Sequence, residues 1–319
     1  MRSLQVSALS PDLSGTALMD RPEPILRADQ VLIRVRAAAL NFPDLLMTRG
    51  DYQLKPPLPF TPGMEIAGDV IAGEGFAPGS AVVAGMRVGG FAERVAVDAG
   101  SVRRKPAHLS YAKAAGVGTA YLTAYVALVR LANLQPDEWV VVHGATGGVG
   151  LAAVDLAKAL GARVIATSRS AQKLAIVADQ YGVDAALVAP GFRERVKEIT
   201  GGGADVIYDP VGGDVFDESV RCIAFGGRLL VVGFTSGRIA SVSTNMPLIK
   251  GFSVIGVRAG EYGRQFPERG RENQEAIWAM AEAGRIRPRV HAEYPLDRWQ
   301  DAFRAMERSE MIGKIALIP

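Results

Sequence analysis

The chain has 319 residues, of which 49% are hydrophobic and 22% are charged, and this composition excludes a disordered or low-complexity protein. Its 36 Lys and Arg residues against 33 Asp and Glu residues leave a net charge of only +3. Because these charges are not clustered, a nucleic-acid-binding surface is not expected. The single cysteine excludes an intramolecular disulfide.

The cysteine and histidine residues predict no metal site. No two of them lie at the close spacing of structural zinc ligands, although a catalytic zinc held by distant His and Asp side chains stays formally open. The residues are Cys222, His108, His143 and His291. The first residues, MRSLQVSALSPDL, lack the apolar core of a secretory signal. No apolar run approaches the roughly 20 residues of a membrane span, so we expect a cytoplasmic protein.

The first part of the chain predicts short β-strands, and the second part predicts alternating strands and helices. Strand-like segments stand among Pro and Gly residues at 31–40, 64–73 and 89–99. A buried helix over 119–134 opens the second part, whose regular alternation predicts βαβ units and a parallel sheet covered on both faces. The predicted strands are 138–144, 163–168, 184–189, 204–212, 227–234 and 251–257, and the predicted helices are 148–162, 170–182, 192–201 and 214–226.

The last part of the chain is too short for an independent domain. It predicts two helices, 274–288 and 296–309, and a final strand, 313–319. We expect it to return and pack on the first part. The sequence therefore predicts an α/β protein with one domain formed by residues 1–117 and 258–319 and a second formed by residues 118–257.

A glycine-rich segment, VVVHGATGGVG, lies between an apolar strand and an Ala-rich helix. Gly147 and Gly148 allow backbone N–H groups to approach a pyrophosphate, and Gly150 allows the helix to pack close to the strand. The helix N-terminus adds its positive dipole end. In the G-x-G-x-x-G fingerprint aligned on Gly147 and Gly150, Ala145 replaces the first glycine. The strand–turn–helix context predicts a dinucleotide site, with a structural turn as the alternative.

The end of the next strand indicates which dinucleotide is bound. An NAD site requires a carboxylate about 20 residues after the loop to bind the ribose 2′-hydroxyl, and no Asp or Glu occurs between residues 156 and 178. Ser168, Arg169 and Lys173 occur there instead. A hydroxyl, a guanidinium and an ammonium suit a 2′-phosphate, so we predict NADPH. The alternative for Arg169 and Lys173 is a solvated surface.

Taken together, these features resemble the medium-chain dehydrogenase/reductase superfamily, and within it the zinc-free NADPH:quinone oxidoreductases of the zeta-crystallin type. The resemblance covers essentially the whole chain. It rests on ALNFPDLLMTRGDY (39–52), PPLPFTPGMEIAGDV (56–70), GGFAERV (89–95), AYLTAYVAL (120–128), GATGGVG (144–150), YDPVGG (208–213), GRLLVVGF (227–234) and GKIALIP (313–319). It implies a GroES-like β-rich catalytic domain and a Rossmann doubly wound nucleotide-binding domain, with the active cleft between them.

The resemblance also implies that no zinc is bound. Zinc-dependent members have Cys where this chain has Asn41, and Gly-His-Glu where it has Gly63-Met64-Glu65. They also carry a four-cysteine lobe that this chain lacks. Without a Lewis acid, simple alcohol oxidation loses its stabiliser for an alkoxide, whereas hydride transfer to an electron-poor acceptor remains feasible.

The resemblance further implies roles for individual residues. Asn41 and Tyr52 are expected beside the nicotinamide and the substrate, with Asp44 nearby, and these three are the candidate catalytic residues. Tyr52 has the alternative of a packed loop aromatic, and Asp44 that of a helix cap. The expected cofactor-binding residues are Asn41, Thr123, Gly144, Ala145, Gly147, Gly148, Val149, Ser168, Arg169, Lys173, Gly233 and Phe234. Family members often stack a Tyr on the adenosine, and here only Phe192 is available.

Three functions follow from the resemblance. The first is hydride transfer from NADPH to a small quinone. The second is reduction of an activated C=C bond in an enone or enoyl thioester, because reductases of that kind share the layout of Asn41, Asp44, Gly50 and Tyr52. Arg258, Arg264 and Arg269 are then the candidates for binding the CoA phosphates, with a solvated loop as the alternative. The third is a non-catalytic NADPH-binding protein. A homodimer is expected through edge strands around 228–257.

Overall fold

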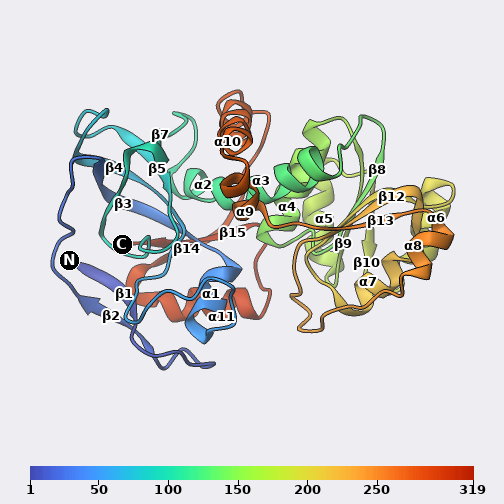
Figure 1. Ribbon diagram of the computed structural model, residues 1–319, viewed down its shortest axis with the longest axis horizontal. Helices are drawn as coiled ribbons and strands as arrows, with labels where there is room; N and C mark the ends of the chain where they lie inside the picture. Colours follow the sequence, from blue (N-terminus) through green and yellow to red (C-terminus); the bar gives the residue numbers. More distant parts are fainter. The chain divides into compact units, whose positions relative to one another are not determined.

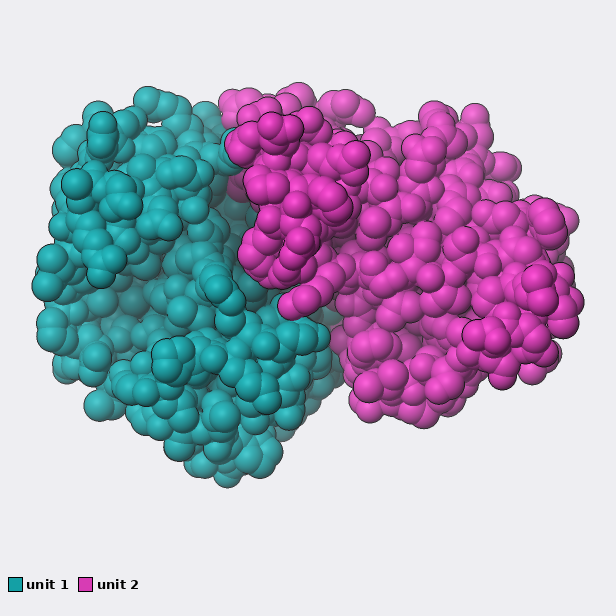
Figure 2. Space-filling view, viewed as in Figure 1, with its two compact units in different colours: residues 1–119, 288–319 teal, residues 120–287 magenta.

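The computed structural model describes residues 1–319 and divides them into two compact units (Figure 2). Unit 1 comprises residues 1–119 and 288–319, and unit 2 comprises residues 120–287. The chain therefore returns to unit 1 at Pro288 and not near residue 258. None of the helices combines the length and the apolar character that a membrane span requires.

The later return has a physical reason in the contacts of residues 258–287. Arg130 donates from Nε to Asn273 Oδ1 over 2.6 Å and from Nη2 to Glu272 over 2.7 Å. Arg285 donates to the carbonyl of Ala159 over 3.0 Å. These bonds tie the segment to helices of unit 2, and no local pattern in the sequence indicates such pairings between residues more than 100 positions apart.

Unit 1 is built on a seven-stranded sheet that combines the first and the last parts of the chain (Figure 1). The strand order is β14-β15-β3-β4-β5-β7, and β6 also pairs with β3. The strands are β3 (Gln30–Leu40), β4 (Glu65–Gly73), β5 (Ala81–Gly85), β6 (Arg94–Asp98), β7 (Val102–Arg104), β14 (Val290–Pro295) and β15 (Lys314–Ile318), beside a two-stranded sheet of β1 (Arg2–Val6) and β2 (Thr16–Asp20). The helices are α1 (Phe42–Arg49), α2 (Tyr111–Ala115) and α11 (Trp299–Glu307).

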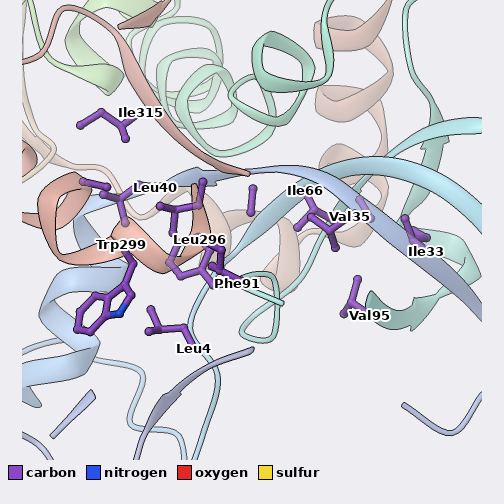
Figure 3. Close-up of a cluster of buried hydrophobic side chains, with 14 of the residues drawn as sticks. Leu4, Ile33, Val35, Leu40, Ile66, Phe91, Val95, Leu296, Trp299 and Ile315 are labelled. Atoms are coloured by element: carbon purple, nitrogen blue, oxygen red, sulfur yellow. The ribbon is translucent and has the colours of Figure 1, made fainter. Parts of the chain in front are cut away.

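The core of unit 1 explains why the return strand is held. In β3, Val31, Ile33 and Val35 are buried while Arg34 and Arg36 are not, which is the alternation of a strand with one covered face. Figure 3 shows the side chains that cover this face, with contributions from both ends of the chain. Phe303 of α11 packs edge-on against Phe91 at 6.2 Å between ring centroids and against Trp299 at 5.6 Å. Each such aromatic contributes roughly 1.5–3 kcal/mol through burial.

Unit 2 is a six-stranded sheet in which every neighbouring pair is parallel. The order β10-β9-β8-β11-β12-β13 is that of a doubly wound sheet, so the predicted parallel sheet is confirmed. The strands are β8 (Trp139–Val142), β9 (Arg163–Ser168), β10 (Ala185–Val188), β11 (Ala204–Asp209), β12 (Ile223–Val231) and β13 (Ser253–Gly256). The helices are α3 (Gly118–Tyr125, which starts in unit 1), α4 (Gly148–Ala159), α5 (Ala171–Tyr181), α6 (Arg193–Thr200), α7 (Gly213–Ser219), α8 (Asn245–Lys250), α9 (Ala259–Gln265) and α10 (Pro267–Glu282).

Two predicted helices differ from the observed ones. The helix predicted over 214–226 ends at Ser219, and β12 already begins at Ile223, where the chain pairs with Ala204 before a register shift. Gly226, with φ 77°, lies in this irregular stretch. The helix predicted over 119–134 changes at Val126 from α to a π-helix that ends at Leu131. Periodicity alone does not distinguish these two helix types.

A buried carboxylate on α4 fastens the two segments of unit 2 that lead to unit 1. Asp155 is 1% exposed. It accepts a hydrogen bond from Tyr121 Oη over 2.7 Å and one from the backbone N–H of Arg287 over 2.5 Å. Burial raises the pKa of Asp155, against the lowering effect of these bonds. Tyr121 and Arg287 lie next to the two points where the chain passes from one unit to the other. The Asp155 side chain therefore binds both of these segments.

Candidate functional site

The carboxyl edge of the parallel sheet is the natural binding site of unit 2. The strand order reverses between β8 and β11, and ligands of doubly wound sheets bind at the carboxyl ends of the strands at such a switch point. The glycine loop follows β8, Ser168 ends β9, and Gly233 follows β12. The structure therefore brings these predicted cofactor residues to one edge of unit 2.

The glycine loop has the backbone geometry expected of a phosphate-binding turn. Gly144 adopts φ 56°, and a Cβ on Gly150 would lie 2.2 Å from the carbonyl oxygen of Gly144. Only glycine permits this close approach of helix to strand. Helix α4 starts at Gly148 with Gly147 as its N-cap and no side chain capping it. The N–H groups of its first turn are thus available for an anion, and its dipole favours one.

The end of β9 carries positive charge and no carboxylate. Ser168 Oγ lies 3.2 Å from Thr146 Oγ1 of the glycine loop, so the two loops meet. Arg169 is exposed, and Lys173 is half-buried in the first turn of α5. Ser170 caps that helix by accepting a hydrogen bond from the Lys173 N–H. The predicted 2′-phosphate residues lie together here.

The loops after β11 and β12 complete this edge. Asp209 accepts hydrogen bonds from the N–H groups of Val211 and Gly212 over 2.8 and 2.9 Å, which fixes a tight turn. A Cβ on Gly212 would lie 3.0 Å from the ring of Phe234, so the two loops pack closely. Phe234 remains 42% exposed. Thr123 lies half-buried on α3.

Beneath the glycine loop lies His143, which the sequence analysis did not assign. Its Nδ1 is 2.7 Å from Thr167 Oγ1 and its Nε2 is 2.8 Å from Ser219 Oγ. Because Ser219 Oγ donates its one proton to the Val215 carbonyl, it must accept from Nε2–H, so the imidazole carries a proton on Nε2. Complete burial lowers the pKa of His143 to about 3. Phe192 packs on its ring at 4.7 Å and is itself buried, so it lies in the core of unit 2.

In unit 1, Asn41 and Asp44 form the start of α1. Asn41 is the N-cap, and Asp44, which is fully buried, accepts hydrogen bonds from the N–H groups of Asn41 and Gly63, both over 2.9 Å. Burial raises the pKa of Asp44 to about 7, although these two bonds act to lower it. The contacts of Asp44 include those of a capping box at the start of α1. Tyr52 packs beside a small apolar group that includes Met47 and Phe60.

Two charged residues join Asn41 in unit 1, and sequence reasoning missed both. Glu65 Oε1 accepts from Asn41 Nδ2 over 3.0 Å, and Glu65 Oε2 accepts from the Thr119 N–H over 2.7 Å. Lys314 Nζ is 3.0 Å from Glu65 Oε1. We call Asn41, Asp44, Glu65 and Lys314 the buried polar cluster. One feature of the sequence could have indicated these two residues. Each is a charged residue at the start of a largely apolar strand segment, EIAGDV for Glu65 and GKIALIP for Lys314.

Comparison with protein-family models finds two matches. The model of the alcohol dehydrogenase GroES-like domain matches residues 27–107, and the zinc-binding dehydrogenase model matches residues 148–274. The expected GroES-like unit is thereby confirmed. The residues present do not fit the zinc ion that the second name implies. No group of three or more His, Cys, Asp or Glu side chains is placed to hold a metal, and the Glu65 carboxylate is already bound to an ammonium.

Individual relatives extend over nearly the whole chain. A quinone oxidoreductase-like protein 2 homolog of Nematostella vectensis is 37% identical over 307 residues, which are 92% of this chain and 82% of the relative. A segment of a pikromycin polyketide synthase component of Streptomyces venezuelae is 36% identical over 95% of this chain and 8% of that protein. The quinone oxidoreductase of Thermus thermophilus, solved also as its complex with NADPH, superimposes with a TM-score of 0.86 at 32% identity over 100% of both chains.

We expect His143 to make the protein less stable as the pH falls below about 6.5. The unfolded chain takes up the proton near its ordinary pKa of 6.5, whereas the folded chain resists protonation until about pH 3. Between these values the unfolded state binds more protons, so acid favours it. In His143→Gln, the decrease in Tm between pH 6.5 and 4.5 should be smaller than in the wild type. Exposed His108→Gln is the control, and equal slopes for wild type and His143→Gln would contradict the assignment.

Proposed function

Because the chain belongs to the quinone oxidoreductase-like branch of the medium-chain dehydrogenase/reductase superfamily, we propose that it transfers a hydride from NADPH to a small quinone without a metal ion. The observation that carries the cofactor is the carboxyl edge of unit 2. There an uncapped helix N-terminus, a glycine loop and the end of β9, which is basic and has no carboxylate, lie together. The quinone is supported by the relatives that carry this name.

The residues present fit NADPH. The first turn of α4 and the loop of Gly144, Ala145, Gly147, Gly148 and Val149 would hold the pyrophosphate through backbone N–H groups. Arg169, Lys173 and Ser168 would hold the 2′-phosphate. Thr123, Gly233 and Phe234 are proposed to contact the nicotinamide half. When bound, NADPH supplies a hydride, which suffices for an electron-poor acceptor.

The residues of unit 1 are proposed to orient the reacting groups and to handle the proton. Reduction of a quinone by one hydride and one proton gives the hydroquinone. We assign to Tyr52 the hydrogen bond to the ribose or the donation of that proton. Asn41 is proposed to contact the nicotinamide side. Asp44 acts through Asn41, because both of its carboxylate oxygens are bound to backbone N–H groups.

A second candidate is reduction of an activated C=C bond in an enone or enoyl thioester. It is favoured by the 36% identity to a polyketide synthase segment and by the shared layout of Asn41, Asp44, Gly50 and Tyr52. A CoA thioester would need free basic groups. Arg264 pairs with Glu261 over 2.8 Å, and Arg269 donates to Tyr262 Oη over 3.2 Å. These contacts leave Arg258, which is 67% exposed and 3.9 Å from Glu261, as the main basic group for a CoA phosphate, so the quinone stays the first candidate.

A screen of NADPH oxidation separates the candidates. We expect turnover with a simple 1,4-quinone at least about tenfold above that with crotonyl-CoA or an enone, because a quinone is the more electron-poor acceptor and takes up a hydride without a metal to activate it. Measurement of kcat/KM for each acceptor decides the order. Faster turnover of crotonyl-CoA would establish the second candidate. Tight NADPH binding without turnover of any acceptor would establish a non-catalytic binding protein.

Arg169→Ala should weaken NADPH binding selectively. One charge-assisted hydrogen bond to a phosphate contributes about 1.5–3 kcal/mol, so KM for NADPH should rise roughly tenfold or more, while KM for NADH stays unchanged. Arg193→Ala is the control, since it removes a partly exposed arginine on α6 that pairs with Glu194. Equal KM values for NADPH and NADH in the wild type, unaltered by Arg169→Ala, would refute the 2′-phosphate assignment.

We also propose that the protein is a homodimer joined through unit 2. Strand β13 is at the end of the sheet and pairs only with β12, so its outer edge has free backbone groups. Large apolar side chains are exposed around it, which is costly for a monomer. They are Phe225 (88% exposed), Leu248 (82%), Ile249 (72%) and Val254 (37%). A second copy would extend the sheet and cover these side chains.

Light scattering at micromolar concentration should give twice the 33.8 kDa mass of one chain. Leu248→Asp combined with Ile249→Asp should shift the protein to the monomer, because two buried carboxylates would oppose association. Ile25→Asp, which changes an 88% exposed side chain of unit 1, is the control. A wild-type protein with the mass of a single chain would contradict the dimer.

A further inference from the structure

The ammonium of Lys314 lies between Asn41 and Glu65, and all three residues are buried. Nζ is 2.6 Å from Asn41 Oδ1 and 3.0 Å from Glu65 Oε1. Lys314 is 6% exposed, Asn41 is 4% exposed and Glu65 is 3% exposed. An ammonium has only donors, so its partner on Asn41 must be the amide oxygen. The orientation of this amide is thus set by chemistry.

Strand register places the three residues together. Strand β3 lies between β15 and β4, with Ile315 opposite Leu40 and Ile66 opposite Ala38. Lys314 directly precedes Ile315 in the chain, and Glu65 directly precedes Ile66. They therefore flank the end of β3, where Asn41 follows as the N-cap of α1.

The other hydrogen bonds of the Asn41 amide leave it with one unused hydrogen-bonding position. Asn41 Nδ2 donates to Glu65 Oε1 over 3.0 Å and to the Ala39 carbonyl over 3.2 Å. Both amide protons are therefore used. Of the two lone pairs on Oδ1, one accepts from Lys314. The N–H of Asp44 bonds to the backbone carbonyl of Asn41 over 3.0 Å and not to its side chain, so one acceptor position on Oδ1 remains.

We propose that Lys314 is a positioning residue that fixes Asn41 as a hydrogen-bond acceptor toward the bound ligand. Asn41 then selects a ligand group that donates, such as a ribose hydroxyl or the N–H of a carboxamide. This proposal rests on the proposed function, in which Asn41 contacts the cofactor.

The reversed amide would be costly in this surrounding. Its N–H groups would face the ammonium, and its oxygen would face the Ala39 carbonyl and the Glu65 carboxylate. Both changes leave buried polar groups without partners. Lys314 and Glu65 thus act together, the first requiring an acceptor and the second a donor.

The decisive variant is Lys314→Met combined with Glu65→Gln. Lys314→Met alone leaves a buried carboxylate without its cation, which destabilises the fold. In the double variant no charge is left unpaired. The glutamine can still accept from the Thr119 N–H while its amide donates toward Asn41. We expect the double variant to fold with a Tm near that of the wild type and with the Asn41 amide reversed.

Turnover should report this reversal. We expect kcat for quinone reduction to fall about tenfold in the double variant, the size of one lost hydrogen bond. In an Asn41→Ala background, the same pair of changes should cause no further loss, because Lys314 acts through Asn41. Lys105→Met is the control, since Lys105 is a partly buried lysine of unit 1 that donates to the Pro106 carbonyl. Unchanged kcat in a folded double variant, or equal losses with and without Asn41, would overturn the proposal.

A second measurement does not need an acceptor. In the wild type, the side-chain N–H protons of Asn41 should exchange with solvent at least about tenfold more slowly than in the double variant, as measured by NMR. Equal exchange would overturn the proposal, and this readout also applies if the double variant is only marginally stable. If the wild type turns over no acceptor, the proposed function fails, while slow exchange would still show that Lys314 fixes the amide.

Discussion

A lysine ammonium can be buried only when other groups replace the water it loses, and this requirement organises unit 1. Glu65 supplies the opposite charge to Lys314, and Asn41 supplies a neutral acceptor. The second oxygen of Glu65 binds the Thr119 N–H. The Glu65 carboxylate thereby connects the start of β4 to the start of α1 and to the start of α3. The geometry of Asn41 follows from this arrangement.

Unit 2 is governed by a different constraint, the direction of its strands. Because all six are parallel, the loops after β8, β9, β11 and β12 emerge at one edge. Polar groups beneath that edge are satisfied internally, as His143 and Asp209 show. The exposed groups, such as Arg169, are those that remain available to a ligand. The parallel sheet thus covers the inner side of these loops and leaves their outer side exposed to a ligand.

The sequence predicted the local features well and the long-range contacts poorly. The close approach of Gly150 to Gly144 was predictable, because both residues belong to one strand–turn–helix motif. The contact of Lys314 with Asn41 was not, since it depends on the pairing of segments 273 residues apart. The return near residue 258 was also misplaced, because only folded contacts such as Arg130 with Asn273 tie that segment to unit 2. The two alternatives for Asp44, a helix cap and an active-site role, could not be weighed from the sequence, because its hydrogen bonds and its burial depend on the fold.

The division of the chain sets an order for folding during synthesis. Unit 2 is a continuous segment, so it has all its strands once residue 287 has left the ribosome. Unit 1 lacks β14 and β15 until later. Until Lys314 is made, Asn41 and Glu65 have no cation between them, and residues Ala38–Leu40 of β3, which later pair with β15, have no partner on that side. A nascent chain would therefore carry a finished parallel sheet and an open edge in its other sheet, and that edge is the surface a chaperone has to protect.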